Sequence, residues 1–292
     1  FLTRSGVLNS VHAFSESPIG PWLLAFFAVI VVVSVGLIGW RGDRLHSPGS
    51  IDSPLSREGA FLANNVLFSV FAFVVLLGTV FPLVVEALQD RTIIVGEPFF
   101  DRLTIPIGIT MLTIMAIAPV LPWRKASQEL LSTRLFWPAW CGVLALAGSV
   151  LVGATGFAPL LTFAMGGFAA GSALRQVVLA TRRQGLRGLV GRANGGMIVH
   201  LGVIIISVAL AASNSFTHSQ ELNLEVGKVA SFSGHTFELV EVVEEKTERV
   251  FSVKARVIVD GGKAYAPAIT RYLKQGMTVG TPSVRTGLAS DV

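Results

Sequence analysis

The chain has one cysteine, Cys141, among its 292 residues. A single cysteine forms no disulfide within the chain, and it leaves no CxxC or CxxCH motif for thiol exchange or covalent haem attachment. Because Cys141 lies inside an apolar run, we expect it to be a small packing residue. Histidine is also scarce, and no two of the five histidines lie three or four residues apart. The sequence therefore specifies no local metal site.

Charged residues are also few, at 14% of the chain against 52% apolar residues. Soluble domains carry about a quarter charged residues, so the composition indicates an integral membrane protein. The net charge of +5 and the pI of 9.8 would suggest a nucleic-acid partner in a soluble protein. Here the Lys and Arg residues lie in short loops between apolar runs, which reports membrane topology and argues against nucleic acid.

Long apolar runs are what the sequence has in abundance. Six of them are long enough to cross a lipid bilayer as helices. We expect the spans near residues 22–40, 61–88, 103–123, 136–152, 160–181 and 196–213. Together they predict a polytopic α-helical bundle over residues 22–213.

The basic loops orient this bundle. Excess Lys and Arg mark the cytoplasmic side of a membrane, and they gather in loops 41–57, 124–134 and 182–192. The alternation of six spans then places residues 1–21, as a surface segment, and everything after residue 213 on the outer side.

The composition changes from Glu221 onward. Apolar residues alternate with polar ones, as in a half-buried strand, and turn residues occur at Ser233-Gly234 and at Asp260-Gly261-Gly262. We predict that residues 214–292 form a small β-rich domain outside the membrane. Its size favours a binding or docking role over a catalytic one.

Local signals within the helices predict caps and close contacts. Ser56 is expected to cap the helix that follows it, with Glu58 in the first turn. The pairs Gly166-Gly167 and Gly195-Gly196 are expected to be sites where helices approach closely. The chain has no internal repeat, phosphate-binding loop, HExxH motif or Ser-His-Asp spacing.

Two histidines are candidates for chemistry. His200 lies inside the last apolar span, where a polar side chain is costly unless something binds it. A neutral imidazole can ligate a metal or haem iron, or it can hydrogen-bond a neighbouring helix. His12 lies in the outer surface segment, where a solvated loop residue and a ligand are both open readings.

Several segments of the chain are familiar in combination. FLTRSGVLNSVHAF, SPLSREGAFLANNVLFSVFAFVVLLGTVFPL and GGMIVHLGV are followed by LNLEVGKVASFSGHTFEL, RYLKQGMTV and PSVRTGLASDV. In this order they resemble the CcmF-type haem lyase subunit of the bacterial cytochrome c maturation system (System I). The resemblance extends over nearly the whole chain.

The resemblance implies a haem-handling function in the bacterial inner membrane. Members of this family accept haem from a periplasmic haem chaperone and help attach it to the CxxCH motif of apocytochrome c, as part of a complex with other maturation subunits. A resident b-type haem would supply an electron to the incoming haem iron. His12 matches a periplasmic ligand of the incoming haem, and His200 matches an intramembrane ligand of the resident haem.

The resemblance also implies that the chain is a fragment. The family's Trp-rich WWD segment, the first half of its helices and its final span are absent from this sequence, as are the partner histidines of both haem sites. The chain also begins with Phe rather than Met.

Two other classes of function compete with this reading. One is a polytopic transporter or channel, against which stand the few charged residues within the spans and the absence of an inverted pair of broken helices. The other is a membrane-anchored sensor that uses its external β domain. Six spans are more than an anchor requires.

Overall fold

The computed structural model describes most of the chain, including the whole of every long apolar span. The described residues are 19–45, 51–91, 93, 95–125, 127–185, 187–190, 192–273, 277–287 and 291–292. His12 and His46 lie outside them.

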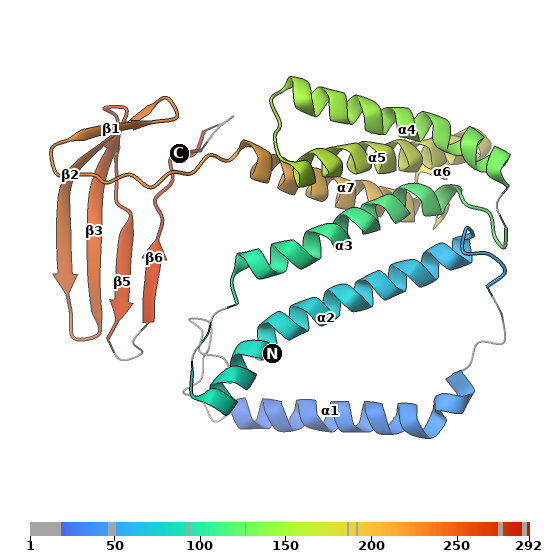
Figure 1. Ribbon diagram of the computed structural model, residues 1–292, viewed down its shortest axis with the longest axis horizontal. Coiled ribbons are helices and arrows are strands. Elements are labelled where there is room, and N and C mark those ends of the chain that lie inside the picture. The colour runs from blue at the N-terminus through green and yellow to red at the C-terminus, as the bar shows by residue number, and fades with distance from the viewer. Residues whose placement is uncertain are drawn as a thin grey trace. The chain divides into compact units, whose positions relative to one another are not determined.

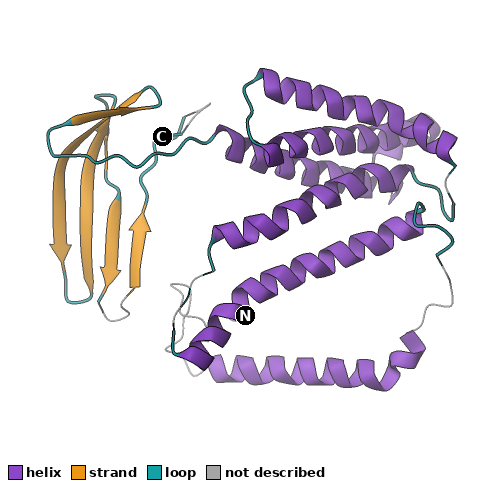
Figure 2. Cartoon of the chain, in the orientation of Figure 1, coloured by secondary structure: helices purple, strands orange, loops and turns teal. Residues whose placement is uncertain are grey.

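In the described part of the chain, six long helices, one short helix and two 3₁₀ turns precede the strands (Figures 1 and 2). The long helices are α1 (Ile19–Arg41), α2 (Arg57–Gln89), α3 (Glu97–Ile117), α4 (Gln128–Leu151), α5 (Phe157–Gln184) and α7 (Arg192–Phe216). The short helix α6 (Arg187–Val190) and the 3₁₀ turns η1 (Gly42–Leu45) and η2 (Ala118–Val120) connect them. All six long helices are apolar and long enough to span a membrane, so the prediction of a six-helix membrane protein is confirmed.

Local sequence explains how α2 begins, but Pro82 does not interrupt it. The hydroxyl of Ser56 accepts the backbone N–H of Gly59 at 3.0 Å, and Glu58 lies in the first turn, as predicted. The helix continues through Pro82 to Gln89. In an apolar helix a proline removes one backbone hydrogen bond without ending the helix, because neighbouring groups can compensate.

Helix α5 is the centre of the bundle and packs against α3, α4 and α7 (Figure 1). Small residues permit this close packing. A Cβ at Gly166 would lie 2.9 Å from Cγ2 of Val208 on α7, and one at Gly171 would lie 2.9 Å from the Cys141 sulfur on α4. The predicted contact role of Gly166-Gly167 is therefore confirmed. Cys141 faces Gly171 of α5, but the residue as a whole is exposed, so it is packed on one side only.

The second glycine pair behaves differently. Among the described residues, no atom beyond the adjoining helix backbone lies within 4 Å of a Cβ built at either Gly195 or Gly196, so the predicted close contact there is wrong. Sequence spacing finds small residues on a helix, but it does not say whether a second helix covers that face.

Two apolar clusters hold the helices together. Leu112 and Ala116 of α3 meet Ala169 of α5 and Ile204 of α7 in the larger cluster. The smaller cluster consists of Ala154, Phe163 and Ala211. Both lie on the α5–α7 interface, so the contact between these two helices extends over several turns.

Side chains from three helices close the end of α3. The carbonyl oxygen of Pro119 accepts hydrogen bonds from Arg57 Nη2 of α2 and Gln176 Nε2 of α5, each at 3.1 Å. The next carbonyl, that of Val120, accepts Arg134 Nη1 of α4 at 2.8 Å. The backbone carbonyls at the 3₁₀ turn η2 are thus satisfied by side chains of the neighbouring helices.

Large apolar side chains cover the outside of the helices. Every described side chain of α1 from Trp22 onward is exposed, and its tryptophans Trp22 and Trp40 are 78% and 76% exposed. Such a surface would be an aggregation liability in water. It is the surface expected of helices whose solvent is lipid, with tryptophans near the interfaces.

Residues from His218 onward belong to a different compact unit from residues 30–217, and they contain a six-stranded antiparallel sheet. Its strands are β1 (Val229–Phe232), β2 (His235–Lys246), β3 (Val250–Val259), β4 (Ala264–Tyr265), β5 (Ala268–Tyr272) and β6 (Met277–Thr281). The hydrogen-bonded order is β1-β2-β3-β5-β6, and β4 pairs with β3. The predicted β domain is confirmed.

Both predicted turn signals mark turns of this sheet. Ser233 and Gly234 have φ values of 50° and 84°, which suit the two-residue hairpin closed by Phe232 and His235. Asp260 and Gly261 have φ values of 54° and 65° at the end of β3. Left-handed φ is tolerated by Gly and Asp, which is why these residue types predicted the turns.

Candidate functional site

The candidate site is built on α7, an apolar helix with one imidazole. Residues 193–216 include no Asp, Glu, Lys or Arg, so His200 has no charged partner on its own helix. The helix begins at Arg192, which puts His200 about two turns from its basic end.

His200 lies on the packed side of α7. The neighbouring Leu201 packs on the larger apolar cluster, and Ile204, one turn further along, is buried within that cluster. The imidazole is half-buried, and its Nδ1 atom is enclosed without a hydrogen-bond partner. An enclosed polar atom without a partner costs about 1–3 kcal/mol, so His200 is a poor residue for packing alone.

A second enclosed polar atom lies in the same layer of the bundle. Ala169 of α5 and Ile204 of α7 share one cluster. One turn from Ala169 toward the C-terminus of α5 is Ser172, and one turn from Ile204 toward the N-terminus of α7 is His200. Ser172 is fully buried, and its Oγ atom also lacks a partner.

The remaining histidines are placed as follows. His12, the expected periplasmic ligand, and His46 lie outside the described residues. His218 is exposed just after α7. His235 begins β2 and has a charged partner that the sequence did not reveal. Among the described residues no group of three or more His, Cys, Asp or Glu side chains could hold a metal ion.

Asp260 organises a polar cluster at one end of the sheet. Its Oδ2 atom accepts His235 Nδ1 at 2.8 Å and Arg285 Nη1 at 2.6 Å, and its Oδ1 atom accepts the backbone N–H of Thr236 at 2.9 Å. The Thr236 hydrogen bond, followed by those from His235 and Arg285, holds the pKa of Asp260 well below its usual range. Through Asp260, the cluster joins Arg285, in the segment after β6, to the beginning of β2.

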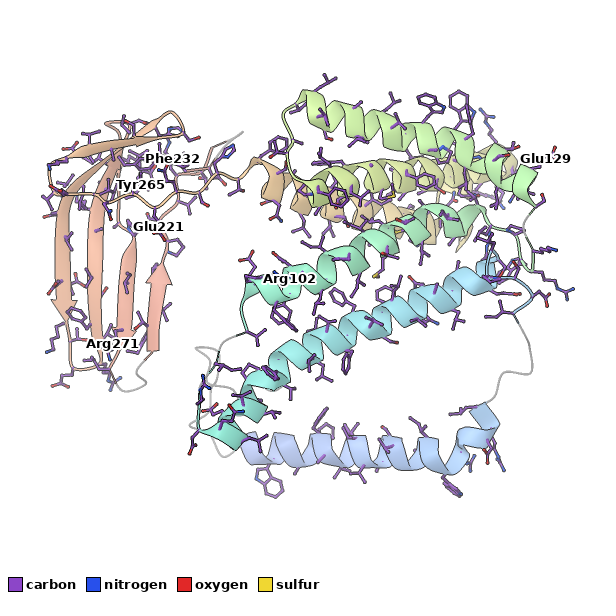
Figure 3. All side chains as sticks on the ribbon, in the orientation of Figure 1. Arg102, Glu129, Glu221, Phe232, Tyr265 and Arg271 are labelled. Carbon is purple, nitrogen blue, oxygen red and sulfur yellow. The ribbon has the colours of Figure 1, made fainter. Side chains whose placement is uncertain are left out.

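An open hollow of about 400 Å³ lies on β2, β3 and β4. It is lined by Tyr265, which Figure 3 shows at the end of the sheet opposite to Arg271, and by two ion pairs. Lys254 and Glu245 lie 2.7 Å apart, and Arg256 and Glu241 lie 3.1 Å apart. Because these acids and bases neutralise one another, the hollow has the character of a solvated surface rather than of a reactive site.

Sequence reasoning selected His200 as a candidate, but it did not single out the unpartnered Ser172 or the Asp260 cluster. A serine among the glycines and alanines of α5 looks like another small packing residue. Only its burial without a partner distinguishes it. Arg285 is 25 residues from Asp260, and no local pattern links residues so far apart in a β domain.

Comparison with known proteins gives consistent matches. No protein-family model matches the chain. The cytochrome c-type biogenesis protein CcmF of Pseudomonas aeruginosa is 30% identical over 243 residues, which cover 81% of this chain and 37% of that protein. The cytochrome c-type biogenesis protein ccl1 of Rhodobacter capsulatus is 32% identical over 308 aligned positions, covering 100% of this chain and 46% of that protein. CcmF of Escherichia coli is 30% identical, over 84% of this chain and 38% of that protein.

A solved structure supports the same relationship. The structure titled cytochrome c heme lyase CcmF matches with a TM-score of 0.64 and 26% sequence identity, over 93% of this chain and 43% of that one. The chain thus spans less than half the length of these relatives. In sequence and in fold, the chain belongs to the CcmF-type cytochrome c biogenesis proteins.

Proposed function

We propose that the chain provides part of a haem lyase in cytochrome c maturation, and that His200 is an axial ligand of a resident b-type haem. The observation that carries this proposal is the half-buried imidazole of His200, with one enclosed and unpartnered nitrogen on a helix that has no counter-charge. A neutral imidazole in an apolar setting is a common iron ligand. The relatives named as cytochrome c biogenesis proteins set the biochemical context.

The residues of the site suit haem in their chemistry. His200 offers one nitrogen to iron, and the exposed apolar side chain of Val203, three residues further along the same helix, suits a hydrophobic macrocycle. A second axial ligand would come from outside this chain, because it spans less than half of its relatives. A haem held at His200 would supply one electron to the iron of the haem substrate.

His12 has a separate role in this proposal, as a ligand of the incoming haem on the periplasmic side. The incoming haem is the substrate, delivered by a haem chaperone. The thiols that add across its vinyl groups belong to the CxxCH motif of apocytochrome c. The chemistry therefore needs no cysteine from this chain, and Cys141 has no role in it.

Placement in the inner membrane completes the proposal. The basic loops lie inside, and the β domain lies in the periplasm, where a docking role toward the haem chaperone, apocytochrome c or other maturation subunits suits its solvated surface.

The decisive experiment is a reduced-minus-oxidised absorption spectrum. The protein is purified from its native membranes with any polypeptide that copurifies, as wild type, His200→Ala and the control His218→Ala, whose histidine is exposed. We expect a b-type spectrum in the wild type and in the control, and its loss in His200→Ala. A colourless wild type from cells with adequate haem would refute the resident-haem assignment. A transporter or a membrane-anchored sensor would then be the better interpretation of the sequence.

His12→Ala is expected to give the complementary result. The resident-haem spectrum should remain, because it depends on His200, while the yield of holocytochrome c should fall to a small fraction of wild type. Haem-stained gels of membrane and periplasmic fractions measure that yield. Normal cytochrome levels in the His12→Ala strain would contradict the proposed role.

A further inference from the structure

Among the described residues, the two enclosed side-chain polar atoms without a partner belong to Ser172 and His200. They come from facing helices, since α5 and α7 pack along their lengths. Ser172 lies one turn from Ala169 and His200 one turn from Ile204, in the same direction along the bundle axis, and Ala169 and Ile204 belong to one cluster. Two such atoms in one layer indicate a shared function rather than two independent defects.

Ser172 departs from the usual behaviour of a helical hydroxyl. Thr113, Thr162, Thr181 and Ser207 each donate to the carbonyl four residues earlier in their own helix, at 2.8 or 2.9 Å. This local bond is the normal way to satisfy a buried hydroxyl. Ser172 makes no such bond although it is fully buried, so its oxygen is available as an acceptor.

The chemistry of a ligating histidine calls for such an acceptor. A neutral imidazole that gives the lone pair of one nitrogen to iron carries its proton on the other nitrogen. Ligating histidines nearly always donate that N–H to a fixed partner, which sets the tautomer and the ring orientation and raises the basicity of the ligand. In His200 the enclosed nitrogen is Nδ1, which leaves Nε2 for iron.

We propose that Ser172 is the positioning residue of His200, with its Oγ atom accepting the Nδ1–H of the imidazole when Nε2 binds iron. This inference rests on the proposed function of His200. It adds a residue of α5 to a site otherwise defined by α7, and it explains why a serine occupies a fully buried position on a helix packed with glycine and alanine.

The test compares Ser172→Ala with Ser207→Ala in the haem-loaded protein. The control removes a hydroxyl from α7 that is already satisfied by Val203 O at 2.9 Å. Haem retention is measured by transfer to excess apomyoglobin, and the midpoint potential is measured by spectroelectrochemistry. We expect Ser172→Ala to bind haem about 10–100-fold more weakly and to have a more positive potential, because a less basic imidazole stabilises ferric iron less.

Three outcomes overturn the inference. Ser172→Ala could match wild type in both measurements, which removes any role for the hydroxyl. It could lose haem without a change in potential, which is the signature of disturbed packing. Ser172→Thr, which keeps a hydroxyl, could shift the potential as far as Ser172→Ala does. Failure of the proposed function is a different result: the His200→Ala protein would keep the b-type absorption spectrum.

Discussion

At the scale of single residues, Asp260 and His200 differ in whether their polar atoms have hydrogen-bond partners. Asp260 has hydrogen bonds to both carboxylate oxygens. Nδ1 of His200 has no partner. A satisfied cluster stabilises a fold, whereas an unsatisfied buried group is a cost that folding alone does not explain. The contrast separates a structural residue from a functional candidate.

Asp260→Asn is expected to loosen the C-terminal segment in a pH-dependent way. The folded-state pKa of Asp260 is depressed, so its stabilising effect is fully present above the ordinary carboxyl pKa of about 3.9 and is lost as the pH falls toward the folded-state value. Hydrogen exchange of residues 283–287 in the purified chain should therefore be faster in the variant at pH 7, and the difference should shrink near pH 3.

A matched control for this prediction is Glu245→Gln. Glu245 pairs with Lys254 at 2.7 Å, but both side chains are exposed, and such surface pairs contribute little. It should leave exchange in the segment 283–287 unchanged at both pH values. Equal exchange in Asp260→Asn and wild type at pH 7 would mean that the carboxylate does not hold the segment.

At the scale of elements, packing in the bundle depends on backbone approach along α5. A Cβ at Gly167 would overlap the Ala145 side chain and would lie 2.7 Å from the carbonyl oxygen of Cys141, both on α4. Backbone cannot move aside as a side-chain tip can. Where apolar surface faces lipid, the hydrophobic effect does not drive helices together, and close contact has to do so.

Gly167→Ala is accordingly expected to destabilise the chain by about 1–3 kcal/mol, the usual cost of overpacking a tight contact. Thermal unfolding in detergent, followed by circular dichroism, would show a lower Tm. Gly202→Ala is the control, because nothing lies within 4 Å of its added Cβ, and a helical glycine replaced by alanine gains about 0.5–1 kcal/mol. Equal Tm values for the two variants would contradict the α4–α5 contact.

At the scale of the whole molecule, the chain combines six apolar helices with one β domain (Figure 2). It matches at most 46% of the length of the relatives described above. In the function proposed above, this chain contributes one candidate ligand to each haem site, His12 to one and His200 to the other. A bis-histidine site assembled from two polypeptide segments would make haem binding depend on their association.

Cysteine labelling tests the proposed topology. Cys141 is the sole cysteine, so Cys141→Ser gives a clean background. Into it we place Gln89→Cys, Gln184→Cys or Glu248→Cys, which replace exposed residues and remove no positive charge. A membrane-impermeant maleimide should label Gln89→Cys and Glu248→Cys in intact spheroplasts and Gln184→Cys only after lysis. Labelling of Glu248→Cys only after lysis would place the β domain inside.

The sequence by itself determined the features that depend on nearest neighbours along the chain. Apolar runs predicted six helices, Ser56 predicted a helix cap, and Asp and Gly at Asp260-Gly261 predicted a turn with left-handed φ. Family resemblance, carried by segments such as the one around His200, predicted the match to CcmF-type proteins. These signals are local, so they can be recognised without knowledge of the fold.

Tertiary structure decided which surfaces meet. It made Gly166 and Gly167 contact sites and left Gly195 and Gly196 open, because only the first pair faces other helices. It joined Asp260 to Arg285 across 25 residues, and it placed the buried hydroxyl of Ser172 in the layer of His200. Which polar atoms are enclosed, and which partners they lack, depends on how distant segments pack, and local sequence does not encode it.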